Sequence, residues 1–181
     1  MKIFAVYTKL HLTEQPDWLD GFREQYDKPW FFHNTLKQPC FIKDKELPEL
    51  RSTLDRFFSE HPGNITVSFD EVVVDETKQG KVIMVRAKSA EPLVKLQKAL
   101  VQQLAQYDRY IKPDHRQYEK DFDPHITIGR HLSDEQYREA SVLLDKGCAC
   151  TGMIDEVVFA VVKDDTVEEG MNPANHTVYR L

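Results

Sequence analysis

The chain has 181 residues, of which 41% are hydrophobic, so it can bury one sizeable core and we expect a single domain over residues 1–181. Its formal net charge is -6, which argues against a protein that neutralises many phosphates along a long nucleic-acid duplex. The sequence has no stretch near the roughly 18 consecutive apolar residues of a membrane span, and its start does not resemble a signal peptide. We therefore expect a cytoplasmic monomer with no membrane partner.

The expected secondary structure belongs to the α+β class. Strands are predicted from β-branched and aromatic residues, and helices from apolar spacing such as that of Leu93, Leu96 and Leu100. A hairpin across 76–81 argues against a parallel, doubly wound sheet. Strands are expected at 2–8, 31–36, 65–74, 82–87, 125–129, 154–162 and 177–181, and helices at 15–26, 46–60, 91–107 and 133–146.

The cysteines predict neither a disulfide framework nor a zinc site. There are three of them, and Cys148 and Cys150 are separated by one residue rather than by the two of a CxxC pair. Neither histidine motif described below has a carboxylate or a third histidine at metal-ligand spacing. We expect no metal and no cofactor.

A histidine followed two positions later by threonine or serine occurs four times, at 11–13, 33–35, 125–127 and 131–133. The tripeptide alone is therefore not specific. The first and the last precede expected helices, where a hydroxyl most simply caps free backbone N–H groups, and we interpret them as structural.

The other two tripeptides lie in expected strands. Residues two apart point to the same face of a strand, so His33 projects with Thr35, and His125 with Thr127. On the second strand the apolar Ile126 would face the core and anchor the motif. Each strand can thus present one imidazole beside one hydroxyl.

Such a set suits phosphodiester cleavage without a metal. One imidazole accepts a proton from the attacking oxygen while the other gives a proton to the leaving oxygen, because histidine titrates near neutrality. Two hydroxyls can donate hydrogen bonds to the phosphate oxygens as charge accumulates on them. A single strand histidine is more often a structural residue than a catalyst, and it is the presence of two matching strands that favours catalysis.

These residues resemble the two-histidine (2H) phosphoesterase superfamily, which includes the RNA 2',3'-cyclic phosphodiesterases also called 2'-5' RNA ligases. His33 and His125 are 125 − 33 = 92 positions apart, which fits the layout of that family. The stretch 122–130 is similar to its second motif, including Pro124 before the histidine and Arg130 after it.

The resemblance implies a bilobal α+β fold in which two mainly antiparallel sheets form a central cleft, with helices on the outside. It implies that His33 is the general acid and His125 the general base, in roles that exchange when the reaction is reversed. It also implies that Thr35 and Thr127 hold the phosphate.

One departure from the family pattern occurs at Asn34, where an apolar residue is usual. Unpaired, a buried amide there would cost roughly 1 to 3 kcal/mol, so Asn34 is either hydrogen-bonded or partly wet. The polar residues Lys37 and Gln38 that follow are a second difference.

Three further features have two interpretations each. Arg130 either binds the substrate phosphate or is paired with a carboxylate. The connection 108–123, which carries His115, Arg116 and Tyr118, either borders the cleft or is a solvated loop. The aromatic cluster at 30–32, Trp30 with Phe31 and Phe32, either stacks a base or belongs to the core.

Together the residues predict an enzyme that hydrolyses a 2',3'-cyclic phosphate or another 2'-linked phosphodiester, on an RNA end or a small nucleotide, with possible 2'-5' RNA ligase activity. One alternative is a module of the same fold that binds nucleotides or RNA ends without catalysis. Another is an unrelated α+β domain with coincidental motifs. Separation of His33 from His125 in the fold would exclude the catalytic hypothesis.

Overall fold

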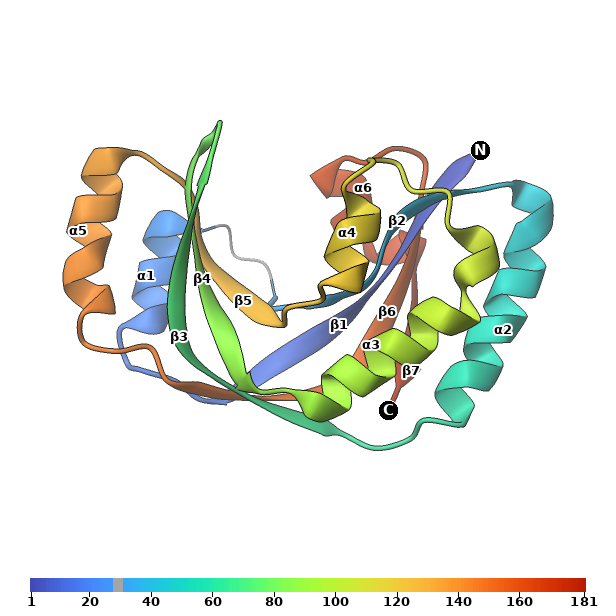
Figure 1. Cartoon of the computed structure of the whole chain (residues 1–181), viewed down its shortest axis with the longest axis horizontal. Helices are drawn as coiled ribbons and strands as arrows, with labels where there is room; N and C mark the ends of the chain where they lie inside the picture. The colour runs from blue at the N-terminus through green and yellow to red at the C-terminus, as the bar shows by residue number, and fades with distance from the viewer. Residues whose placement is uncertain (28–30) are drawn as a thin grey trace.

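The computed structural model describes residues 1–27 and 31–181. Its strands and helices are interspersed along the chain and form two lobes (Figure 1). The strands are β1 (Lys2–Glu14), β2 (Thr35–Ile42), β3 (Ile65–Thr77), β4 (Gly80–Ser89), β5 (His125–Leu132), β6 (Cys150–Val162) and β7 (His176–Arg180). The helices are α1 (Leu19–Tyr26), α2 (Leu47–Ser59), α3 (Glu91–Gln103), α4 (His115–Lys120), α5 (Asp134–Leu144) and α6 (Val167–Met171).

All seven strands belong to one antiparallel sheet, in the order β2-β1-β6-β3-β4-β5, with β7 also paired to β6. The α+β class and the antiparallel pairing are confirmed, but the strands form one sheet rather than the two expected. The reason is the length of β6, whose first residues, Cys150–Ile154, pair with Ile65–Phe69 of β3, while later residues pair with β7. The β3–β4 pair has register shifts around Phe69, and beyond this point β3 continues into the other lobe with β4 and β5.

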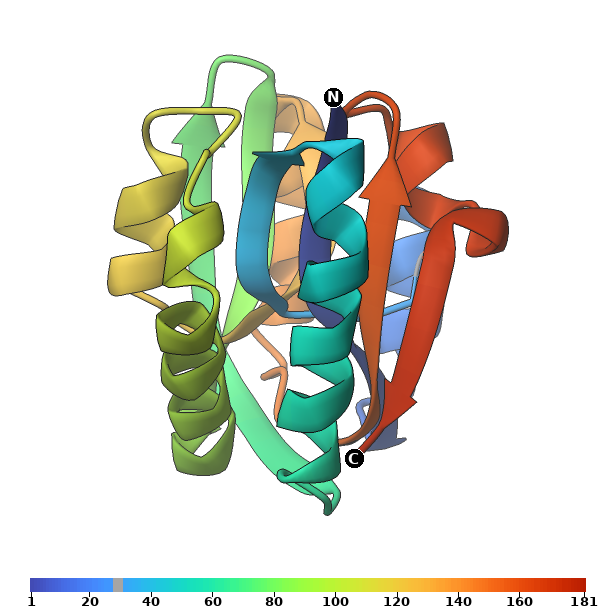
Figure 2. The ribbon, with the colours of Figure 1, turned by 90° about the vertical axis from the view of Figure 1, so that its right-hand side faces the viewer.

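The helices cover the sheet with apolar faces. Leu50, Leu54, Phe57 and Phe58 of α2 are buried, and α2 and α3 stand side by side over the strands of one lobe (Figure 2). Helices α1 and α5 lie outside β3, β4 and β5 in the other lobe (Figure 1). In the part of the chain that the structure describes, no helix is long and apolar enough to cross a membrane.

Most expected elements are present with shifted ends, and the expected 76–81 hairpin is the turn between β3 and β4. Helix α5 begins as predicted, because Ser133 Oγ accepts from Gln136 N at 3.2 Å and the Gln136 side chain accepts from Ser133 N at 2.9 Å. The cap expected at Thr13 is wrong. Thr13 lies in β1 and its hydroxyl donates to the carbonyl of Thr151.

Candidate active site

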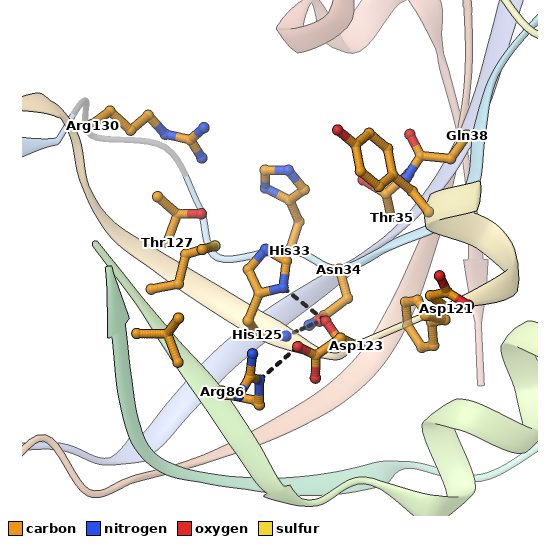
Figure 3. A pocket seen from close by; sticks show the side chains of 14 residues that line it. His33, Asn34, Thr35, Gln38, Arg86, Asp121, Asp123, His125, Thr127 and Arg130 are labelled. Atoms are coloured by element: carbon orange, nitrogen blue, oxygen red, sulfur yellow. Dashed lines mark hydrogen bonds and ion pairs between the residues drawn. The ribbon is translucent and has the colours of Figure 1, made fainter. Parts of the chain in front are cut away.

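The predicted site residues meet in one cavity of about 370 Å³ between the two lobes. Figure 3 shows the imidazoles of His33 and His125 next to each other, with Thr127 and Arg130 on one side and Thr35 on the other. The fold thus brings together side chains that are far apart in the sequence. The separation that would have excluded the catalytic hypothesis is not observed.

The first motif is not the regular strand that was expected over 31–36. Strand β2 begins at Thr35, and His33 precedes it. The segment still lies along β1, since Thr8 N donates to Asn34 O at 2.9 Å, but Asn34 N donates to the Thr8 hydroxyl rather than to a backbone carbonyl. This side-chain bond interrupts the ladder, and His33 and Thr35 nevertheless both line the cavity.

The second motif is the predicted strand, with the predicted faces. His125 and Thr127 of β5 line the cavity, whereas Ile126 and Ile128 are fully buried. Because β5 lies at the end of the strand order, one of its edges has no strand partner among the described residues, and the first motif contacts β5 at that edge through Asn34. The apolar face anchors the strand, and the polar face carries the imidazole and the hydroxyl.

The two histidines are held in the same way. His33 donates from Nδ1 to the carbonyl of Phe31 at 3.4 Å, and His125 donates from Nδ1 to the carbonyl of Asp123 at 2.8 Å. A carbonyl oxygen only accepts, so in both rings Nδ1 carries the proton and Nε2 is left for proton transfer. This local symmetry matches the near-equivalent roles expected from the sequence.

The environment of His33 favours its neutral form. Burial lowers the pKa of His33 below its ordinary value, and the positive charges of Arg130 and a protonated His125 lower it further. The bond to Phe31 and the carboxylate of Asp27 act in the opposite direction without reversing the shift. At neutral pH His33 is therefore suited to accept a proton.

Arg130 combines both of its predicted interpretations. Its Nε donates to Asp27 Oδ1 at 3.0 Å, so it is paired with a carboxylate just beyond the end of α1. Its side chain is 40% exposed and lines the cavity, with the guanidinium directed toward the histidines (Figure 3). The carboxylate orients a cation that can still reach an anion in the cavity.

The structure decides between the two expectations for Asn34, which is only 4% exposed. Its Oδ1 accepts from the backbone N–H of His125 at 3.1 Å, so the amide is hydrogen-bonded and buried rather than wet. Among the described residues its Nδ2 has no partner, which leaves a desolvation cost of roughly 1 to 3 kcal/mol.

Sequence reasoning did not find Arg86, although it lies in a predicted strand. Arg86 is the register partner of His125 in the β4–β5 pair and lines the cavity. Its Nε donates to Asp123 Oδ2 at 2.6 Å, and Asp121 also lines the cavity. Strand order cannot be read from the sequence, so no signal placed this arginine beside the histidine. The cavity therefore holds both cations and carboxylates.

The connection 108–123 contains α4 and borders the cavity, so the interpretation as a plain solvated loop is wrong. Tyr118 and Phe122 both line the cavity, and Tyr118 is 56% exposed. Arg116 and the buried His115 are not among the lining residues of this cavity. Trp30 lies outside the described residues, while Phe32 is in the core.

A second cavity, of about 240 Å³, adjoins the first and shares Thr35 and Gln38 with it. Its floor is the face of β1 and β6, where Ala5 and Ala160 are register partners and leave a hollow between larger side chains. Tyr7 also lines this cavity, and its hydroxyl donates to the Gly170 carbonyl at 3.2 Å. Space for a ligand thus continues past Thr35 beyond the first cavity.

A bilobal α+β fold with two His-x-Thr motifs at one cavity defines the class of two-histidine phosphoesterases. The sequence profile of the 2'-5' RNA ligase superfamily matches residues 12–166, and the chain belongs to this superfamily. The family resemblance predicted from the motifs is confirmed. A comparison with curated proteins gave no match.

Several solved structures have a similar fold. Usb1 from Kluyveromyces marxianus aligns with a TM-score of 0.54 and 13% identity, over 99% of this chain and 98% of that chain. The same protein with uridine monophosphate gives 0.51 and 10%, over 99% and 98%. A phosphoesterase gives 0.52 and 12%, over 100% and 96%. At these identities the similarity shows the fold.

Proposed function

We propose that this protein hydrolyses a 2',3'-cyclic phosphate, or another 2'-linked phosphodiester, on an RNA end or a small nucleotide. The observation that carries the proposal is the pair of imidazoles that share one cavity with the hydroxyls of Thr35 and Thr127. Among the described residues, neither Nε2 has a hydrogen-bond partner. Membership of the 2'-5' RNA ligase superfamily supports the same substrate class.

In the proposed reaction, water attacks the phosphorus of the cyclic phosphate and the bond from phosphorus to O3' breaks. One imidazole takes the proton of the water, and the other gives a proton to O3', so the product carries a 2'-phosphate. Each proton transfer contributes about 10²- to 10⁴-fold to the rate. Thr35 and Thr127 donate hydrogen bonds to the non-bridging oxygens, and Arg130 compensates their charge.

We assign the proton-accepting role before reaction to His33, because its lowered pKa keeps the imidazole neutral. His125 then supplies the proton to the leaving oxygen. The family resemblance implied the opposite assignment, and the near-symmetric geometry permits both. The pH dependence of kcat/KM distinguishes them.

The walls of the cavity fit one phosphate with attached nucleosides better than a long polyanion. Arg86 and Arg130 can attract a phosphate, while Asp121 and Asp123 on the same lining disfavour a series of them. Tyr118 offers an exposed ring on which a base can stack, a contact worth about 1 to 3 kcal/mol. We infer a small nucleotide or the last residues of an RNA as substrate.

The direct test is to incubate the protein with each 2',3'-cyclic nucleotide in the presence of EDTA and identify the monophosphate formed. We expect 2'-phosphates, and a loss of at least about 10²-fold in kcat for His33→Ala and for His125→Ala. His11→Ala is the matched control, because His11 belongs to a His-x-Thr tripeptide in β1 and lies outside the cavity.

Three results would contradict the proposal in different ways. Full activity in either histidine variant excludes the two-histidine mechanism. Loss of activity with EDTA indicates a metal-dependent reaction. Binding of a 2'-phosphate nucleotide by calorimetry without any turnover indicates a non-catalytic binding module.

A further inference from the structure

Asn34 is at the point where the two motifs meet. It lies between His33 and Thr35, and its Oδ1 accepts from the backbone N–H of His125 at 3.1 Å. Its own backbone is fixed to β1 on both sides, because Asn34 N donates to the Thr8 hydroxyl at 3.0 Å and Asn34 O accepts from Thr8 N at 2.9 Å. The side chain that accepts from His125 is therefore attached to a backbone that is held by hydrogen bonds at both its N–H and its carbonyl.

The donor of this bond, the backbone N–H of His125, has no partner on β4. His125 and Arg86 are register partners, and in the adjacent pair Ala87 N donates to Pro124 O at 2.8 Å. With that bonding pattern the N–H of His125 points away from β4, toward the edge of the sheet. The Asn34 side chain takes the place of a strand partner at the residue that carries the second imidazole.

The second motif has no equivalent contact to offer. Its intervening residue, Ile126, is fully buried and has no polar side-chain atom. This hydrogen bond between the motifs is therefore made by the side chain of the first motif and the backbone of the second. Asn34 Nδ2 is buried without a partner among the described residues, so burial of this amide costs free energy that an apolar side chain would not.

We propose that Asn34 is a positioning residue that fixes His125 relative to His33. This inference rests on the proposed function, in which both imidazoles must reach one phosphate at the same time. Proton transfer requires heavy-atom separations of about 2.6 to 3.2 Å, and a displacement of about 1 Å at an active site can reduce the rate by about 10²-fold. Asn34 also lines the cavity, but its Oδ1 is engaged by the backbone N–H of His125, and we assign its effect on the reaction to this bond.

The test compares three variants of the full chain. Asn34→Leu has nearly the same size and removes the acceptor, and we expect kcat to fall by about 10- to 100-fold with KM changed by less than about 3-fold. Asn34→Asp keeps an acceptor at the same place, and we expect it to recover most of kcat. Its added negative charge should move the acidic limb of the pH profile upward.

Gln97→Met is the matched control. Gln97 of α3 is a buried amide outside the cavity, its Nε2 donates to Glu119 O at 3.1 Å, and its Oε1 has no partner among the described residues. We expect its kcat to stay within about 3-fold of the wild type, whatever its melting temperature. A kcat for Asn34→Leu within 3-fold of the wild type, or an equal loss in Gln97→Met, would overturn the inference.

Hydrogen exchange separates this inference from the proposed function. The amide of His125 should be protected in the wild type and in Asn34→Asp, and should exchange at least about 10-fold faster in Asn34→Leu. If neither the wild type nor any variant cleaves a nucleotide, the proposed function is wrong. The exchange rate of the His125 amide still tests the contact with Asn34 in that case. An unchanged exchange rate in Asn34→Leu would show that the contact does not hold His125.

Discussion

Arg130 Nε and Asp27 Oδ1 lie 3.0 Å apart and join β5 to the segment after α1. The side chain of Asp27 is 3% exposed, whereas that of Arg130 is 40% exposed, so the carboxylate is the fixed partner and the guanidinium the accessible one. A bond through Nε leaves the two terminal nitrogens in the fork geometry that matches two phosphate oxygens.

This geometry predicts that a lysine at position 130 does not perform the function of Arg130, so Arg130→Lys should lose activity. An ammonium group cannot bond Asp27 and present a fork to a phosphate at the same time. We expect kcat/KM for a 2',3'-cyclic nucleotide to fall by about 10-fold or more, and affinity for a 2'-phosphate product to fall in parallel by calorimetry. Activity equal to the wild type would show that Arg130 is only a structural partner of Asp27.

The pH profile of kcat/KM reports the ionisation of the free enzyme. Burial lowers the pKa of His33, so His33 stays neutral to a lower pH than an ordinary histidine, and the base remains available there. We expect the acidic limb of the profile to fall below about pH 6.5, the ordinary value for histidine.

An NMR titration identifies the group responsible for this limb. The ring signal of His33, assigned by its absence in His33→Gln, should titrate at the same low pH as the acidic limb. If the limb follows the ring of His125 instead, His125 is the base and the roles implied by the family resemblance are correct.

Local sequence patterns correctly predicted the features that depend on residues close together in the chain. Ser133 and Gln136 form the expected capping box, and Ile126 faces the core as alternation required. Contacts between distant segments were not predictable, since Asn34 and His125 are 91 positions apart and Asp27 and Arg130 are 103 apart. Which strands become neighbours depends on the whole fold, and so does the number of sheets.

The second cavity predicts a preference among substrates. A 2'-5'-linked dinucleoside monophosphate has a nucleoside on each side of the phosphate, and the hollow at Ala5 can receive one of them. Ala5→Leu adds side-chain volume to this hollow. We expect it to lower kcat/KM for the dinucleoside at least about 10-fold more than for a 2',3'-cyclic nucleotide. Ala5→Ser is the control of similar size, and equal effects of Ala5→Leu on both substrates would mean that the hollow holds no part of the substrate.

Lys37, noted in the sequence as a departure from the family, is fully buried on β2 next to the site. Its Nζ donates to Asp108 at 2.6 Å and to Glu119 at 2.9 Å, and Glu119 also accepts from Gln38 N at 2.6 Å. Burial alone lowers the pKa of Lys37, but the bonds to Asp108 and Glu119 raise it above its ordinary value, so the ammonium stays charged. These bonds tie β2 to the segment that leads to His125.

Lys37→Met should therefore destabilise the fold strongly. Removing one partner of a buried ion pair leaves an uncompensated charge, which costs about 3 to 5 kcal/mol in the free energy of unfolding. Urea denaturation measures this loss, and Lys88→Met is the control, because the 2.7 Å pair of Lys88 with Asp70 lies on the surface and contributes little. A Lys37→Met variant as stable as Lys88→Met would contradict this expectation. It would show that Glu119 is satisfied without the lysine by Gln38 N and by the Tyr110 hydroxyl, which donates to Glu119 at 2.7 Å, and that solvent satisfies the partly exposed Asp108.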